Sequence, residues 1–109
     1  MSLSELKAMA AEQFGDMVKV VVDVERNLMV AGGELHADEE AYLLEHGSGQ
    51  RALWGINLYP DLFGDEDWLE ADSMINVRPS QGNRSRAIDD PDVMGQVRAL
   101  VVRLVRSDG

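Results

Sequence analysis

The residues from Met17 to Glu25 alternate between an apolar side and a mixed side, and this pattern constrains the fold more than any other in the chain. The apolar side consists of Val18, Val20, Val22 and Val24. Side chains two positions apart lie on the same face of a β-strand, so the stretch predicts a half-buried strand. Arg26-Asn27 predicts a tight turn, because Asn tolerates positive φ, and Leu28 to Ala31 is expected to return as a second strand.

A second pair of strands is expected in the other half of the chain. Ala52 to Tyr59 alternates in the same way and ends at Pro60, which has no N–H for a sheet ladder. Trp68 to Arg78 also alternates, and an acidic connector from Asp61 to Asp67 separates the two stretches. Because sequential strands usually pair, the two stretches predict a second hairpin.

Two helices are expected before and between these hairpins. Ser4 to Phe14 repeats its apolar residues at spacings of three and four, which puts them on one helix face. A second helix is expected to begin at an N-cap of Ala37 or Asp38 and to end near Glu45. Its early acidic residues are favoured at the positive end of the helix dipole.

The clearest helix follows Asp90, which suits the N-cap, and Pro91, which suits the first helical position. An apolar stripe then runs from Val93 to Val105. The element order α-β-β-α-β-β-α predicts a single α+β domain over residues 1–109. We expect an antiparallel sheet of about four strands, built from two hairpins and packed by the N- and C-terminal helices.

Composition excludes several classes of protein. The 109 residues include no Cys, so disulfides, thiolate nucleophiles and Cys-ligated metals are absent. A formal net charge of -10 disfavours nucleic acid and anionic membranes as partners, since both require clustered Lys and Arg. No apolar run approaches the roughly 20 residues that span a bilayer. With no recognisable signal segment, a cytoplasmic location is expected.

Common catalytic and cofactor motifs are missing. The chain contains neither G-x-x-x-x-G-K-[ST] nor G-x-G-x-x-G, and neither H-E-x-x-H nor G-x-S-x-G. We therefore expect no nucleotide hydrolysis, no Rossmann cofactor and no metal centre of the zincin type. No cofactor is predicted.

The best candidate for a ligand site is the loop from Arg78 to Arg86, which contains no acidic residue. Arginine forks bind carboxylates and phosphates, and neutral donors accompany them here. The candidate ligand-binding residues are Arg78, Gln81, Asn83 and Arg84 in the loop and Asn57 and Asn76 on the polar sides of the strands. The alternative is an ordinary loop whose arginines pair with nearby aspartates, beside a sheet face that meets solvent.

A second candidate lies at the expected junction between the second strand and the second helix. His36 ends that strand and stands two positions before Asp38, a spacing that suits a base and its orienting carboxylate or part of a metal site. Two ligands do not make a metal site, and local packing of His36 is the alternative.

Three segments together resemble a small prokaryotic family of uncharacterised proteins. They are Gly33-Glu34-Leu35-His36-Ala37-Asp38-Glu39-Glu40, Leu53-Trp54-Gly55-Ile56-Asn57-Leu58-Tyr59-Pro60 and Ile75-Asn76-Val77-Arg78-Pro79-Ser80-Gln81-Gly82-Asn83-Arg84-Ser85. The resemblance implies a stand-alone small protein and no assigned activity.

Two hypotheses for function follow. The preferred one is a non-enzymatic binding module whose Arg78–Arg86 loop holds a small anion or an acidic protein segment, with self-association into a homo-oligomer. The alternative is a small metal- or acid/base-dependent hydrolase that uses His36 and Asp38, with Arg78 or Arg84 orienting an anionic substrate.

Overall fold

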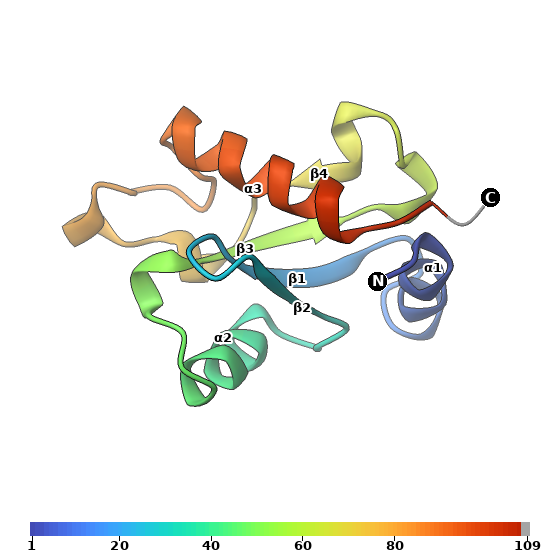
Figure 1. Cartoon of the computed structure of the whole chain (residues 1–109), viewed down its shortest axis with the longest axis horizontal. Coiled ribbons are helices and arrows are strands. Elements are labelled where there is room, and N and C mark those ends of the chain that lie inside the picture. Colours follow the sequence, from blue (N-terminus) through green and yellow to red (C-terminus); the bar gives the residue numbers. More distant parts are fainter. Residues whose placement is uncertain (108–109) are drawn as a thin grey trace.

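A four-stranded antiparallel sheet lies between helices in the computed structural model, which describes residues 1–107 (Figure 1). The strand order is β2-β1-β3-β4. The strands are β1 (Val18–Asp23), β2 (Leu28–Ala31), β3 (Leu53–Leu58) and β4 (Leu69–Glu70). The α+β fold, its element order and its two antiparallel hairpins therefore confirm the prediction from the sequence.

The longest pairing joins β1 to β3, from Val18 opposite Leu58 to Asp23 opposite Leu53. At the far end of β1 the chain turns into β2 through Asn27, whose φ of 55° is the positive value expected for this turn. The buried carboxylate of Asp23 stabilises the turn. Its Oδ1 accepts hydrogen bonds from the N–H groups of Glu25 and Arg26, and its Oδ2 accepts one from the Ser48 hydroxyl at 2.6 Å.

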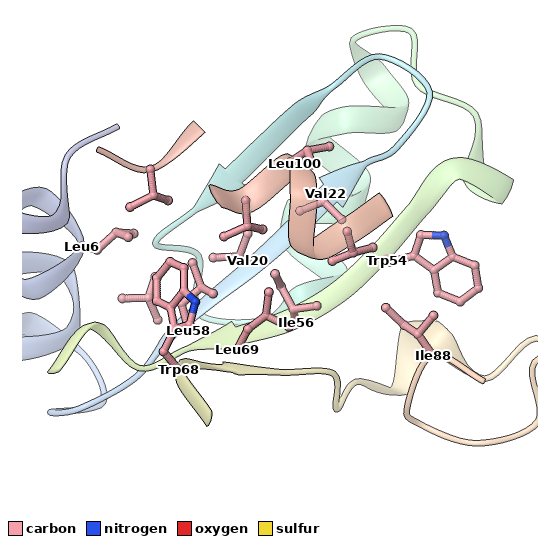
Figure 2. Packing of buried hydrophobic residues seen from close by; sticks show 14 of the residues in the cluster. Leu6, Val20, Val22, Trp54, Ile56, Leu58, Trp68, Leu69, Ile88 and Leu100 are labelled. Atoms are coloured by element: carbon pink, nitrogen blue, oxygen red, sulfur yellow. The ribbon is translucent and has the colours of Figure 1, made fainter. Parts of the chain in front are cut away.

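The alternation of β1 and β3 assigns their side chains to two cores on opposite faces of the sheet. The even-numbered residues form the larger core with α1 (Leu3–Glu12) and α3 (Pro91–Leu104). Figure 2 shows Val20, Val22 and Ile56 in this core, with Trp68 toward one end and Trp54 toward the other. On the opposite face, Val21 and Leu53 pack with Leu43 of α2 (His36–Glu45). Burial on both faces supplies the main stabilisation of the sheet.

The terminal helices lie close to the positions that the sequence predicts. α1 begins at Leu3, one residue before the expected Ser4, and ends at Glu12 rather than at Phe14. Ser2 and Glu5 form a reciprocal capping box at the start of α1. Asp90 caps α3 by accepting the Asp92 N–H, and Pro91 occupies the first helical position. The segment after α3 returns to the start of α1, where the Leu3 N–H donates to the Arg106 carbonyl at 2.8 Å. Within residues 1–107, no helix is long and apolar enough to cross a membrane.

The start of α2 differs from the prediction. Leu35, rather than Ala37 or Asp38, occupies the N-cap position, and its side chain makes no capping hydrogen bond. His36 is therefore the first residue of the helix and not the end of a strand, since β2 already ends at Ala31. An apolar N-cap leaves the first N–H groups of the helix without a side-chain acceptor.

The strand predicted from Trp68 to Arg78 is wrong beyond Glu70. Its alternation is real, but Ser73 lies so close to β3 that a Cβ on Gly55 would approach the Ser73 Cβ to 2.6 Å. The Ser73 hydroxyl accepts the Ile75 N–H, and the chain turns into a short 3-10 helix, Met74–Asn76. The strands predicted over Met17 to Glu25 and Ala52 to Tyr59 are shorter at both ends than expected.

The carboxamide of Asn76 replaces the missing strand at the edge of β3. Its Oδ1 accepts the Gly55 N–H at 2.8 Å, and its Nδ2 donates to the Gly55 carbonyl at 2.9 Å and to the Arg86 carbonyl at 2.8 Å. Asn76 is fully buried, so these bonds form away from solvent. One side chain thus supplies both hydrogen bonds that a neighbouring strand would give to Gly55.

We predict that Asn76→Ala destabilises the fold by about 2–4 kcal/mol, because it leaves the buried N–H and carbonyl of Gly55 without partners. Urea unfolding measures the change. Ser80→Ala, at an exposed position in the following loop, serves as the control and is expected to change the stability by less than about 0.5 kcal/mol. Equal losses for the two variants would contradict the role given to Asn76.

Candidate functional site

Arg78 is buried beneath the loop that it begins. Its guanidinium donates to the carbonyls of Gln50 and Leu53, and its central carbon lies 4.2 Å from the centre of the Trp54 ring. Burial lowers the pKa of Arg78 from its usual value. Only 9% of the residue is exposed, and its Nε has no hydrogen-bond partner among the described residues, so only its terminal nitrogens serve the backbone before and within β3.

Asn83 organises the rest of the loop. Its Nδ2 donates to the carbonyls of Asn76 and Ala87, both at 2.7 Å, and its Oδ1 accepts the Asp89 N–H at 2.8 Å. Its own N–H and carbonyl pair with those of Arg78. The buried amides of Asn76 and Asn83 are thus occupied by backbone partners of this chain.

The remaining polar residues of the loop reach the surface. Gln81 donates from Nε2 to the Arg51 carbonyl at 3.2 Å, and the Arg84 side chain is exposed. Arg86 forms an ion pair with Asp72, in which Nε lies 2.7 Å from Oδ1. Of the three arginines in this loop, only Arg86 lines the cleft that is described next.

A cleft of about 600 Å³ opens on the face of the sheet that carries α2. Its lining comes from β1, β3 and β4, from the first turn of α2, and from Asp72 to Ile75, which leads into the 3-10 helix Met74–Asn76. The exposed side chains of Leu35 and Met74 also line it. Its volume lies within the range of small-molecule sites.

The floor carries a row of three polar residues, one from each strand. Strand register places Lys19 opposite Asn57 and Asn57 opposite Glu70. Asn57 donates from Nδ2 to the Glu70 Oε1 at 3.1 Å, and the Tyr59 hydroxyl donates to the same oxygen at 3.1 Å. Burial and the Glu70 carboxylate raise the pKa of Tyr59. The row on the floor therefore has the cationic Lys19 at one end and the anionic Glu70 at the other.

Asn57 has an unused acceptor in this cleft. The residue is only 6% exposed, and its buried Oδ1 has no hydrogen-bond partner among the described residues. The Nδ2 end of the Asn57 carboxamide faces Glu70, because an ionised carboxylate only accepts hydrogen bonds and so requires a donor. A buried carbonyl oxygen without a donor is costly, so its position in a cleft indicates a place for a ligand N–H or O–H.

The first turn of α2 faces the same cleft. His36 is largely buried and donates from Nε2 to the Ile56 carbonyl at 2.7 Å, which makes Nδ1 an acceptor. Burial lowers the pKa of His36, which favours the neutral imidazole. The backbone N–H groups of His36 and Ala37 have no acceptor among residues 1–107. Such groups at a helix N-terminus attract an anion.

The cleft brings together some predicted site residues and leaves out others. His36 and Asn57 line it, whereas Asp38, Asn76, Arg78 and Arg84 do not. Gln81 and Asn83 line a separate depression of about 640 Å³ beside Trp54. The described residues contain no group of three His, Asp or Glu side chains that could hold a metal ion.

Four charged residues of the cleft were not among the predicted site residues: Lys19, Glu70, Asp72 and Arg86. Lys19 and Glu70 lie on the polar sides of their strands, a signal that the sequence carries. The strand order that makes them neighbours was not deducible. Arg86 was visible only as the end of the polar loop.

From the sequence, Glu39 is expected only to favour the positive end of the helix dipole, but the residue is 1% exposed on the sheet side of α2. Its Oε2 accepts the Gly33 N–H at 3.0 Å, and its Oε1 has no hydrogen-bond partner among the described residues. Burial raises the pKa of Glu39 to about 8. A Cβ on Gly33 would lie 2.7 Å from the Glu39 Cγ, so glycine allows this close approach.

We predict that Glu39→Gln stabilises the protein more at pH 8 than at pH 4. Because the folded-state pKa of Glu39 is raised, its stabilising contribution is full below the unfolded value of 4.5 and is lost as the pH rises toward about 8. Glutamine keeps an acceptor for Gly33 and carries no charge. Urea unfolding is expected to show a gain of about 2 kcal/mol at pH 8. The exposed Glu45→Gln is the control on the same helix, and a gain independent of pH would contradict the prediction.

Residues 1–104 match the family described as a protein of unknown function, DUF5674. No curated protein and no solved structure matches the chain. The match confirms the expected resemblance to a family without an assigned activity. Because it extends over nearly the whole sequence, the chain belongs to the DUF5674 family.

Proposed function

We propose that this protein is a non-enzymatic binding module whose cleft beside α2 holds a small ligand that carries a carboxylate or phosphate group. The observation that carries this proposal is the convergence of the free first turn of α2, Lys19 and Arg86 on one cleft. They are the positive groups of a cleft lining that also holds Glu70 and Asp72, in a chain with a net charge of -10.

Each of these three groups suits an anion for a different reason. The N–H groups of His36 and Ala37 point from the positive end of the helix dipole. Lys19 forms no ion pair with a described carboxylate, and its ammonium lies 5.1 Å from the centre of the Phe14 ring. Arg86 offers a planar fork for an oxyanion, although Asp72 already holds its Nε.

The geometry favours binding over the hydrolase hypothesis. A base and its orienting carboxylate need to lie within hydrogen-bond reach of each other. His36 instead donates to the Ile56 carbonyl, and Asp38 is exposed outside the residues that line the cleft. The Arg78 guanidinium is engaged by backbone carbonyls at the β3 edge. The cleft therefore offers recognition groups without an oriented base.

We predict that inorganic phosphate and pentanoate shift the amide resonances of His36 and Ala37 in a two-dimensional NMR titration. Arg86→Gln should raise the dissociation constant of each probe about fivefold to tenfold, because it removes a charged donor and leaves Asp72 unpaired beside the cleft. Arg103→Gln, at an exposed position on α3, is the control and should leave the affinity unchanged.

Arg84→Gln distinguishes this cleft from the tip of the polar loop. If Arg84→Gln weakens binding and Arg86→Gln does not, the anion binds at the loop that the sequence singled out, and the proposal of a cleft site fails. It also fails if neither probe shifts the amide resonances of His36 and Ala37.

Two further expectations belong to the same proposal: a cytoplasmic location and self-association into a homo-oligomer. Light scattering coupled to size-exclusion chromatography measures the second directly.

A further inference from the structure

We infer that the ligand of this cleft is a zwitterion, with an ammonium group in addition to its anionic group. This inference rests on the proposed function and specifies its ligand class. It follows from the second half of the cleft, where the floor ends in the carboxylate of Glu70 and the unused carbonyl oxygen of Asn57.

Strand register fixes the separation between Lys19 and Glu70, the two charged ends of the floor. Lys19, Asn57 and Glu70 stand in register on three neighbouring strands. Adjacent strands lie about 4.8 Å apart, so the backbone positions of Lys19 and Glu70 are about 10 Å apart. Opposite charges at the two ends of one floor match a ligand with separated opposite charges.

The negative end is built to receive N–H donors. Glu70 accepts from both Asn57 and Tyr59 through the same oxygen, Oε1, and these two bonds orient its carboxylate. The Asn57 Oδ1 adds an acceptor that is buried and unpartnered. An ammonium group carries a positive charge that suits the Glu70 carboxylate, and its three N–H groups are the kind of donor that the Asn57 Oδ1 lacks. An anion alone leaves the Asn57 Oδ1 without a donor.

The other charged and titratable groups of the cleft agree with this assignment. Asp72 is neutralised by Arg86, which leaves Glu70 as the acidic group of the floor. Burial lowers the pKa of His36 and so favours the neutral imidazole with Nδ1 as an acceptor, a form that does not repel an ammonium group. A net charge of -10 repels a simple anion, whereas a zwitterion approaches without that penalty.

Two matched pairs of probes test the inference: 5-aminopentanoate against pentanoate, and L-alanine against propionate. The members of each pair differ only in the amine. In NMR titrations of the full chain, we expect the amino member of at least one pair to bind about fivefold or more tightly than its partner. Its binding should shift the amide resonances of both His36 and Glu70.

Glu70→Gln supplies the structural control. It is expected to reduce the advantage of the amino member to less than twofold without weakening the binding of pentanoate, which no longer meets the like charge of the Glu70 carboxylate. Glu66→Gln removes an equivalent exposed charge outside the cleft and should preserve the advantage. Pentylamine should bind less tightly than 5-aminopentanoate, because it lacks the anionic group.

Different results would overturn the zwitterion inference and the proposed anion site. If each amino member binds no more tightly than its matched acid while the acids still shift His36 and Ala37, the zwitterion inference fails and the proposed anion site stands. An amine advantage that survives Glu70→Gln, or pentylamine binding as tightly as 5-aminopentanoate, also overturns the inference. If no probe binds, the proposed function itself fails.

Discussion

The edge of β3 that β4 leaves unpaired is the constraint on which the rest of the structure depends. β4 pairs with only two residues of β3, Leu58 and Asn57, and the buried backbone groups farther along the strand still require partners. Asn76 supplies them to Gly55, and Arg78 supplies a donor to Leu53. Because an unpaired buried backbone group costs free energy comparable to a lost hydrogen bond, these two side chains replace a strand.

This edge also explains why the densest polar segment of the sequence is mainly structural. The amides of Asn76 and Asn83 hold β3 and the loop, while Arg78 stacks on Trp54 and lies under the loop. The same segment carries Arg86 to the wall of the cleft and leaves the chain irregular from Asp72 to Ile75. The loop thus contributes to the candidate site through its end rather than through its centre.

A second feature, the apolar N-cap of α2, leaves free N–H groups at the cleft. With Leu35 in that position, the first N–H groups of the helix face the cleft without a side-chain acceptor. Farther along the same helix, Glu39 turns toward the sheet and buries a carboxyl group beneath Gly33. α2 therefore carries two groups whose arrangement costs stability, and only the first of them opens on the cleft.

The sequence by itself determined the elements whose local signals agree: the alternation of β1, the Asn27 turn, the Asp90 and Pro91 start of α3, and from these the α+β class. Alternation did not distinguish a strand from the segment after Glu70, because the approach of Ser73 to Gly55 is a contact between distant parts of the chain. Likewise, Lys19, Asn57 and Glu70 become neighbours only through the strand order β2-β1-β3-β4. Local pattern records which face a side chain takes, whereas tertiary pairing decides which side chains share a site.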